Sequence, residues 1–255
     1  MVIQSVDRAL RVLAVLQGAR RRSLGEIATG CGLAPSTVHG LVRTLVAHGM
    51  VVQERDSGLY RLGPATLRLG NVYLDNLELR ARAQPWAEDL ARRTGCAVRV
   101  AVALQRDAIV VGHEPRPDGS RQMTEVGIVV PAHACAVGKA LLAYGACERA
   151  DRPRRMTGET VTESRALDAQ LAAVRRTGLA TEVEEAVLGE CGLASPVAAA
   201  DGVVAGAIGL VVPAGEWPLP PGAPDALRHT ARTISRELGA TTWPPVVEGR
   251  DEAAS

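Results

Sequence analysis

The chain has 255 residues, of which 47% are hydrophobic, so it can bury one large core or the cores of a small and a medium-sized domain. Its 29 basic and 28 acidic residues leave a net charge of +1, so overall charge predicts no polyanionic partner. Five scattered cysteines, a start without a signal-peptide pattern and the lack of an apolar stretch of about 18 residues disfavour a disulfide-rich, secreted or membrane protein; we expect a cytoplasmic one.

The positive charge is concentrated at the beginning of the chain. Residues 1–62 contain eight arginines and four acidic residues, a net charge of +4, which leaves −3 for the remainder. A small basic segment followed by a mildly acidic body is the distribution expected of a protein that contacts nucleic acid through one end.

Three helices are predicted in this basic segment. The first spans about 6–17, with Ser5 as its N-cap. The second, about 24–29, opens with a capping box between Ser23 and Glu26 and is expected to stop at Gly30. The third begins with Pro35 at its first position and ends at His48 and Gly49. The tight turn between the second and third helices is typical of a helix-turn-helix.

The third helix has an apolar stripe and an opposite face of small and polar residues, which suits the major groove of DNA. Residues 50–62 alternate around Asp56-Ser57-Gly58, which predicts a hairpin and hence a winged helix. The alternative is a three-helix scaffold that does not bind DNA. The run of arginines at 20–22 would likewise be only a solvated loop. The candidate DNA-binding residues are Pro35, Ser36, Thr37, His39, Gly40 and Arg43 of the third helix, Arg20, Arg21 and Arg22 of the loop, and Arg61 of the wing.

The rest of the chain predicts an antiparallel α+β domain. Helical periodicity runs from Pro64 to about Thr94, interrupted by Pro85, and indicates a linker helix and a second helix. Apolar runs joined by short turns, including Asp201-Gly202, predict strands. The expected strands are 97–104, 108–112, 179–184, 192–200 and 203–212, and the expected helices 135–146, 164–177 and 224–239. The domains expected are a winged helix-turn-helix at 1–62, a linker helix at 63–82, a sensor domain at 83–240 and a disordered tail at 241–255.

Several separated motifs resemble those of the IclR family of regulators. The matching motifs are QSVDRAL at 4–10, STVH at 36–39, LGP at 62–64, PxHA at 131–134 with GKALLA at 138–143, and ASPV at 194–197. The resemblance covers about residues 3–239. It implies a winged helix joined by a linker helix to a GAF-like effector domain, with the protein acting as a homodimer or tetramer whose binding to double-stranded operator DNA changes with a small-molecule effector.

A second set of motifs resembles the glycerol operon regulators within that family. These motifs are HG at 39–40 with RTL at 43–45, LGNxYLD at 69–75, ELRARA at 78–83, and RPDxSRQ at 116–122 with EVG at 125–127. The resemblance implies a repressor of a glycerol catabolic operon relieved by glycerol 3-phosphate or glycerol. An IclR-type repressor or activator of another operon, responding to a small organic acid, is the alternative.

The resemblance to the IclR family also implies an effector pocket. Small residues from Ala132 to Lys139 lie at a predicted helix start, where backbone amides can receive an anion or a carbonyl oxygen. The family often has a cysteine where this chain has Gly192, one residue after Cys191, and serines where Gly209 and Val211 stand, so a larger effector or another location is expected. A packed sheet without ligand contacts is the alternative, with His133 capping a helix and Lys139 at the rim. The carried-over positions are Val130, Ala136, Val137, Glu182, Gly192, Gly209 and Val211, with Arg121 as a candidate phosphate partner.

Enzyme motifs are incomplete in this sequence. Gly138-Lys139 lacks the rest of a phosphate-binding loop, no G-x-S-x-G occurs, and the glycines from Gly202 to Gly209 do not have dinucleotide-binding spacing. His133 and Cys135 alone do not make a metal site. We therefore expect neither catalysis nor a metal or cofactor. A DNA-binding protein with a purely structural dimerisation body remains a third alternative.

Overall fold

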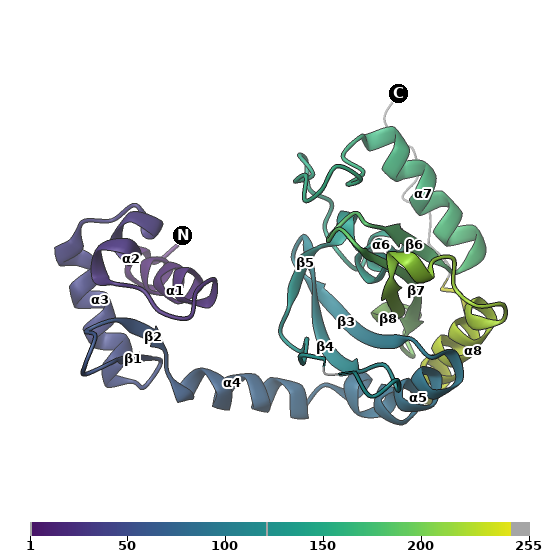
Figure 1. Ribbon diagram of the computed structural model, residues 1–255, viewed down its shortest axis with the longest axis horizontal. Coiled ribbons are helices and arrows are strands. Elements are labelled where there is room, and N and C mark those ends of the chain that lie inside the picture. The colour runs from purple at the N-terminus through teal and green to yellow at the C-terminus, as the bar shows by residue number, and fades with distance from the viewer. Residues whose placement is uncertain (1, 121, 246–255) are drawn as a thin grey trace. The chain divides into compact units, whose positions relative to one another are not determined.

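The computed structural model describes residues 2–120 and 122–245 (Figure 1), and the chain divides into two compact units, Met1–Asn76 and Leu77–Ser255. No helix within the described ranges is long and apolar enough to cross a membrane. The first unit contains helices α1 (Gln4–Gln17), α2 (Leu24–Cys31), α3 (Pro35–Ala47) and α4 (Pro64–Asp75), and strands β1 (Val51–Gln53) and β2 (Tyr60–Leu62).

The first unit is a three-helix core with a two-stranded wing. Its buried centre includes Val12 of α1, Ile27 of α2, and Val38 and Val42 of α3, all at most 1% exposed. The wing strands pair antiparallel, and an isolated bridge between Arg22 and Tyr60 extends this small sheet toward the loop before α2. The predicted winged helix-turn-helix is thereby confirmed.

Two helix ends in this unit differ from the prediction. The N-cap of α1 is Ile3, without a side-chain hydrogen bond, so Ser5 lies inside the helix. Helix α2 passes through Gly30 and ends at Cys31, because the left-handed position that terminates it, with φ of 62°, belongs to Gly32.

The second unit is built on a six-stranded antiparallel sheet in the order β5-β4-β3-β8-β7-β6. The strands are β3 (Ala97–Leu104), β4 (Asp107–Glu114), β5 (Val129–Pro131), β6 (Ala180–Val183), β7 (Glu190–Ala198) and β8 (Val204–Pro213). Helices α5 (Glu78–Thr94) and α8 (Ala223–Glu237) cover one face, and α6 (Ala136–Ala143) and α7 (Ser164–Thr177) lie on the other side (Figure 1). Short 3₁₀ turns occur at Ala132–Ala134 and Ala214–Glu216.

The antiparallel α+β fold predicted from the sequence is confirmed, but some boundaries are not. The long helical stretch breaks at Asn76 and Leu77, earlier than the expected end of the linker helix at residue 82, and α5 runs unbroken through Pro85. The edge strand β5 was not predicted, because three residues are too short for an alternating pattern.

Trp243, in the tail that the sequence predicts to be disordered, packs against the second unit. Trp243 donates a hydrogen bond from Nε1 to the carbonyl of Pro196, 2.9 Å away. Its ring also lies against Gly178, where a Cβ atom would come within 3.1 Å of it. Residues 246–255 lie outside the described residues.

Candidate functional site

Helix α3 presents the polar face that the sequence predicts. Val38, Val42 and Leu45 point into the core, which leaves the opposite side of the helix to solvent. Pro35, Ser36, His39, Gly40 and Arg43 are exposed, and Thr37 is partly exposed. Nothing lies within 4 Å of a Cβ built at Gly40, so this side of the helix is open for close approach of another molecule.

The start of α2 is held by the predicted capping box. The Glu26 amide donates to Ser23 Oγ at 3.3 Å, and the Ser23 amide donates to the Glu26 carboxylate at 2.7 Å. These hydrogen bonds from Ser23 lower the pKa of the Glu26 carboxyl. The cap fixes where the helix-turn-helix begins.

Two of the candidate arginines share one carboxylate on the wing. Glu54 Oε1 lies 3.0 Å from Arg21 Nε and 3.5 Å from Arg61 Nε. Its other oxygen accepts a hydrogen bond from Ser57 Oγ at 3.0 Å. Arg22 is half-buried and lies 3.7 Å from Glu26. Two of the three loop arginines are therefore held by carboxylates, Arg21 by the wing and Arg22 by α2.

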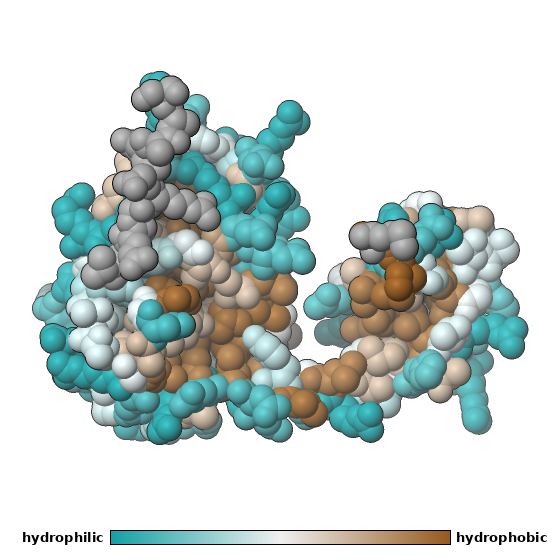
Figure 2. All heavy atoms as spheres, turned by 180° about the vertical axis from the view of Figure 1, so that it is seen from behind, coloured by the Kyte–Doolittle hydropathy of each residue, from teal (hydrophilic) through white to brown (hydrophobic). Residues whose placement is uncertain are grey.

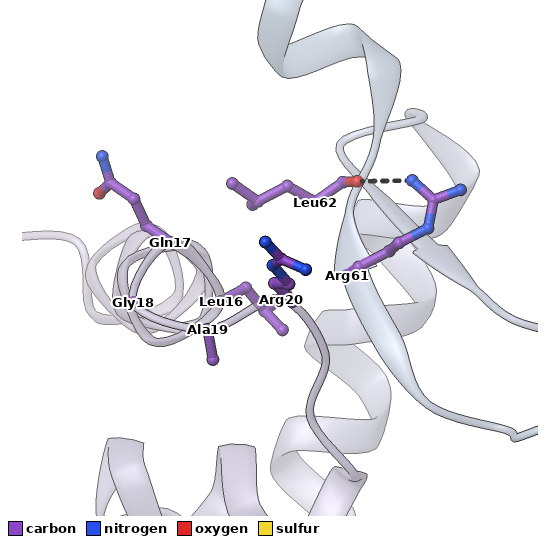
Figure 3. Close-up of a pocket in the computed structure, with 7 residues that line it drawn as sticks. All are labelled: Leu16, Gln17, Gly18, Ala19, Arg20, Arg61 and Leu62. Carbon is purple, nitrogen blue, oxygen red and sulfur yellow. Dashed lines mark hydrogen bonds between the residues drawn. The ribbon is translucent and has the colours of Figure 1, made fainter. Parts of the chain in front are cut away.

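A shallow pocket of about 430 Å³ lies where the end of α1 meets the wing (Figure 3). Arg20 and Arg61 both line it, and Arg61 donates to the carbonyl of Leu62. Two guanidinium groups beside one open hollow suit a phosphate group. Arg20 and Arg43 form no ion pair with any described residue, so no carboxylate of the described chain competes with a polyanion for their guanidinium groups.

Most of the carried-over effector positions come together on the α6 side of the second sheet. Glu182, Gly192 and Val211 are direct cross-strand neighbours on β6, β7 and β8, and Gly209 lies in the adjacent row. Ala136 and Val137 cover them, because a Cβ at Gly192 would lie 3.4 Å from Ala136, and a Cβ at Gly209 would lie 3.0 Å from Val137. Val130 packs against the same core from β5. Arg121 lies outside the described residues.

Glu182 fills much of the space in this row. Its side chain is buried, Oε1 accepts hydrogen bonds from the amides of Glu185 and Ala186, and Oε2 would lie 3.2 Å from a Cβ at Gly192. Burial, helped by the negative charges of Glu190 and Glu185, outweighs these hydrogen bonds and raises the pKa of the Glu182 carboxyl to about 7. We call Glu182, Gly192, Gly209, Val211, Ala136 and Val137 the Glu182 row.

Next to this row is a buried ion pair that the sequence did not indicate. Lys139 is 1% exposed rather than at the rim; its Nζ lies 2.5 Å from Glu185 Oε1 and donates to the Thr181 carbonyl at 3.2 Å. His133 is also buried and bonds the carbonyl of Arg154 rather than capping a helix. A lysine in an otherwise apolar helix is the signal that predicts such a buried partner.

Arg99 is the other charged residue that sequence reasoning missed. It lies directly opposite Gly209 on the neighbouring strand, and its guanidinium is held by the carboxylates of both Glu125 and Glu190. Those hydrogen bonds outweigh burial and raise the pKa of Arg99, while Arg99 holds the pKa of Glu125 below its usual value although burial opposes this. The lone charge in the apolar run 97–104 is the signal that was available.

The described residues contain no group of three or more His, Cys, Asp or Glu side chains placed to hold a metal ion. Burial raises the pKa of the Cys135 thiol to about 12, which makes it a poor nucleophile. The geometry thus offers two candidate sites, an exposed basic surface on the first unit and a small buried row on the second.

Comparison with known proteins identifies both units. Residues 5–55 match the model of the IclR helix-turn-helix domain, and residues 71–236 match that of the bacterial transcriptional regulator IclR C-terminal domain. The glycerol operon regulatory protein of Streptomyces griseus is 43% identical over 249 residues, covering 93% of this chain and 97% of that protein. Its counterpart from Streptomyces coelicolor is 41% identical, with the same shares covered.

A solved structure has the same fold. The IclR transcriptional regulator from Alicyclobacillus acidocaldarius superposes with a TM-score of 0.77 at 26% identity, covering 92% of this chain and 99% of that one.

Proposed function

The chain belongs to the bacterial IclR family of transcriptional regulators, and we propose that within this family it represses a glycerol catabolic operon and releases the operator when a small metabolite binds. The observation that carries this proposal is the 43% identity, over almost the whole length of both chains, to a glycerol operon regulatory protein. A regulator of another operon that responds to an organic acid is the second candidate. Its support is that a regulator of another name, XynR of Escherichia coli, is also similar to this chain, at 30% identity over 203 residues.

The exposed face of α3 enters the major groove of operator DNA. Small residues at its start, Ser36 and Gly40, allow the backbone to approach, while His39 and Arg43 carry long donors for base edges. Arg20, Arg21 and Arg61 contact phosphates beside the helix. The phosphate contacts of the loop and the wing thus orient the protein on the duplex, and the base contacts of α3 read its sequence.

The protein acts as a homodimer, because the first unit exposes an apolar surface that a second copy would cover. Helix α4 buries none of its residues within the described unit. Its brown side chains are visible in Figure 2, and the N-terminal part of α1 adds to the same kind of surface. The exposed apolar residues are Ile3, Val6 and Leu10 near α1 and Leu67, Leu69, Val72 and Tyr73 on α4.

Apolar areas of this kind on a small unit mark interaction sites. A twofold dimer also suits operator recognition, because two α3 helices joined by symmetry read two half-sites about one helical turn apart. The regulator works in the cytoplasm, where its operator DNA lies.

The effector is glycerol or glycerol 3-phosphate, and it acts through the second unit. A ligand changes operator affinity only to the extent that it binds the two conformations of the regulator differently.

An operator shift assay tests the whole proposal. The purified full chain is titrated into a duplex from upstream of its own gene and into a random duplex of equal length, at moderate salt. We expect preference for the upstream duplex, and release by glycerol or glycerol 3-phosphate but not by pyruvate or glyoxylate. Equal binding to both duplexes would refute the regulator, and release by an organic acid alone would favour the second candidate.

A further inference from the structure

Twenty residues, 144–163, join α6 to α7 without forming a helix or strand (Figure 1). Irregular connections longer than about 12 to 15 residues are uncommon in compact domains, and those that occur usually cover a site or bind a partner. The second half of this connection, residues 154–162, folds against the turn that follows β6. We call these nine residues the strap. Five of the nine are exposed, so burial contributes little to holding the strap in place.

Two threonine hydroxyls fasten the strap to the turn that follows β6. Thr157 Oγ1 donates a hydrogen bond to the carbonyl of Glu184 at 2.7 Å, and Thr160 Oγ1 donates to the carbonyl of Glu185 at 2.7 Å. The Thr160 hydroxyl is buried and also accepts hydrogen bonds from two amides within the strap, at 2.9 and 2.8 Å. One side chain therefore both closes the strap on itself and binds it to the turn.

The same turn is bound to the Glu182 row and to α6. The Glu182 carboxylate accepts hydrogen bonds from the amides of Glu185 and Ala186. One oxygen of the Glu185 side chain pairs with Lys139 of α6, and the other accepts from the amide of Val161 in the strap at 3.4 Å. The side chain of Glu185 thus connects α6 to the strap, while its backbone amide connects the turn to the row.

The strap and the turn form part of the wall around the Glu182 row. Val161 and Ala186 pack against the apolar core that contains Ala136 and Val137 of the row. Because Glu182 is 3% exposed and Ala136 and Val137 are at most 7% exposed, a molecule entering the row must first displace part of this wall. The strands are held by backbone ladders, and α6 is buried along most of its length. The strap, held mainly by side-chain hydrogen bonds, is the part that opens at the lowest cost.

We propose that the strap is a latched lid over the Glu182 row, with Thr157, Thr160 and Glu185 as its latch, and that a ligand reaches the row only when this latch opens. The proposal rests on the proposed function in taking the second unit as the part that receives the effector. An open and a closed strap give this unit two forms. A ligand that touches the closed strap binds one form better than the other, which is the condition for shifting their populations.

Two probes follow the strap in the full chain without DNA or effector. Limited digestion with trypsin reports the opening of the latch, because the bond after Arg155 lies in the strap and the amide of Met156 is one that Thr160 holds. Alkylation by iodoacetamide, mapped by mass spectrometry, reports access to the row. Cys135 directly precedes Ala136 and is 7% exposed, and burial raises the pKa of its thiol to about 12, so it reacts slowly while the strap is closed.

Removing either hydroxyl should speed both reactions. We expect roughly 10- to 100-fold for Thr160→Val, which leaves buried amides and a carbonyl without a partner, and a smaller increase of roughly 3- to 10-fold for Thr157→Val. Thr233→Val is the matched control and should react as the wild type does, because the Thr233 hydroxyl donates to the carbonyl of His229 within α8. Alkylation of Cys96, which is buried in the same unit away from the strap, should not change in any variant.

Each other result overturns a stated part of the proposal. The latch is wrong if both threonine variants show the wild-type rates of cleavage and alkylation. The cover is wrong if cleavage accelerates while Cys135 reacts as in the wild type. A rise at Cys96 in Thr160→Val alone means that this variant unfolds the unit, and Thr157→Val then decides; a rise at Cys96 in both variants refutes a separate strap. Because neither probe uses DNA or effector, failure of the strap leaves the operator preference standing, and loss of operator preference leaves the strap standing.

Discussion

The carboxylate of Glu54 determines how much positive charge the wing presents to DNA. It lies between Arg21 and Arg61, at 3.0 and 3.5 Å from their Nε atoms, and is only 20% exposed, whereas the two arginine side chains are 59% and 49% exposed. In Glu54→Gln the side chain keeps its shape but loses its charge. Both guanidinium groups are then free of their internal counter-ion and available to phosphates.

The expected size of the effect follows from the geometry. Exposed ion pairs contribute about 0 to 1 kcal/mol each, so the free energy of unfolding should fall by less than about 2 kcal/mol. Each added phosphate contact steepens the dependence of log K on log salt by about 0.9. One more contact in each copy of a dimer therefore steepens the slope by about 2, which adds a further factor of roughly 10 to the loss of affinity between 50 and 200 mM salt.

Fluorescence anisotropy titrations at several salt concentrations measure this slope on operator and random duplexes. Because phosphate contacts carry no sequence information, both duplexes should show the change. Asp89→Asn is the control, since it makes the same change in net charge on α5 of the other unit. A folded Glu54→Gln protein with the wild-type slope would show that Glu54 does not limit the phosphate contacts of Arg21 and Arg61, and this reasoning about the wing would be wrong.

Three further predictions concern the recognition helix, the dimer surface and the buried carboxyl. Arg43→Ala should lower operator affinity by roughly 1 to 3 kcal/mol and relax the preference at one base pair. If Arg43→Ala binds the operator and each of its single-base variants with the wild-type affinity, Arg43 does not contact DNA. Val72→Asp should shift the protein toward monomer in sedimentation velocity, while Arg68→Ala on the same exposed helix should not; a Val72→Asp protein that sediments as wild type contradicts the surface. The pKa of Glu182 is raised from 4.5 to about 7, so the folded protein keeps a proton that the unfolded chain loses. The stability of the wild type relative to Glu182→Gln is therefore greatest below about pH 4.5 and falls as the pH rises through 7, by up to about 3 kcal/mol in total. Urea unfolding of both proteins at pH 5 and 8 measures it, and a difference independent of pH would mean that the carboxyl titrates normally.

Local chemistry explains why much of the first unit was predictable. A capping box, a proline at the first position of a helix and a glycine in the left-handed region act within a few residues, so Ser23, Pro35 and Gly49 were read correctly from the sequence. The exposed face of α3 follows from the same helical period. The end of α2 was misplaced because two glycines stand two residues apart, and only the backbone shows that Gly32 takes the positive φ.

The charged groups of the second unit were missed because their partners are distant in the sequence. Arg99 meets Glu190 across 91 residues, and Lys139 meets Glu185 across 46. Nothing in the local pattern pairs them, although a single cation in an apolar strand or helix signals that a partner must exist, since an unpaired buried charge is too costly.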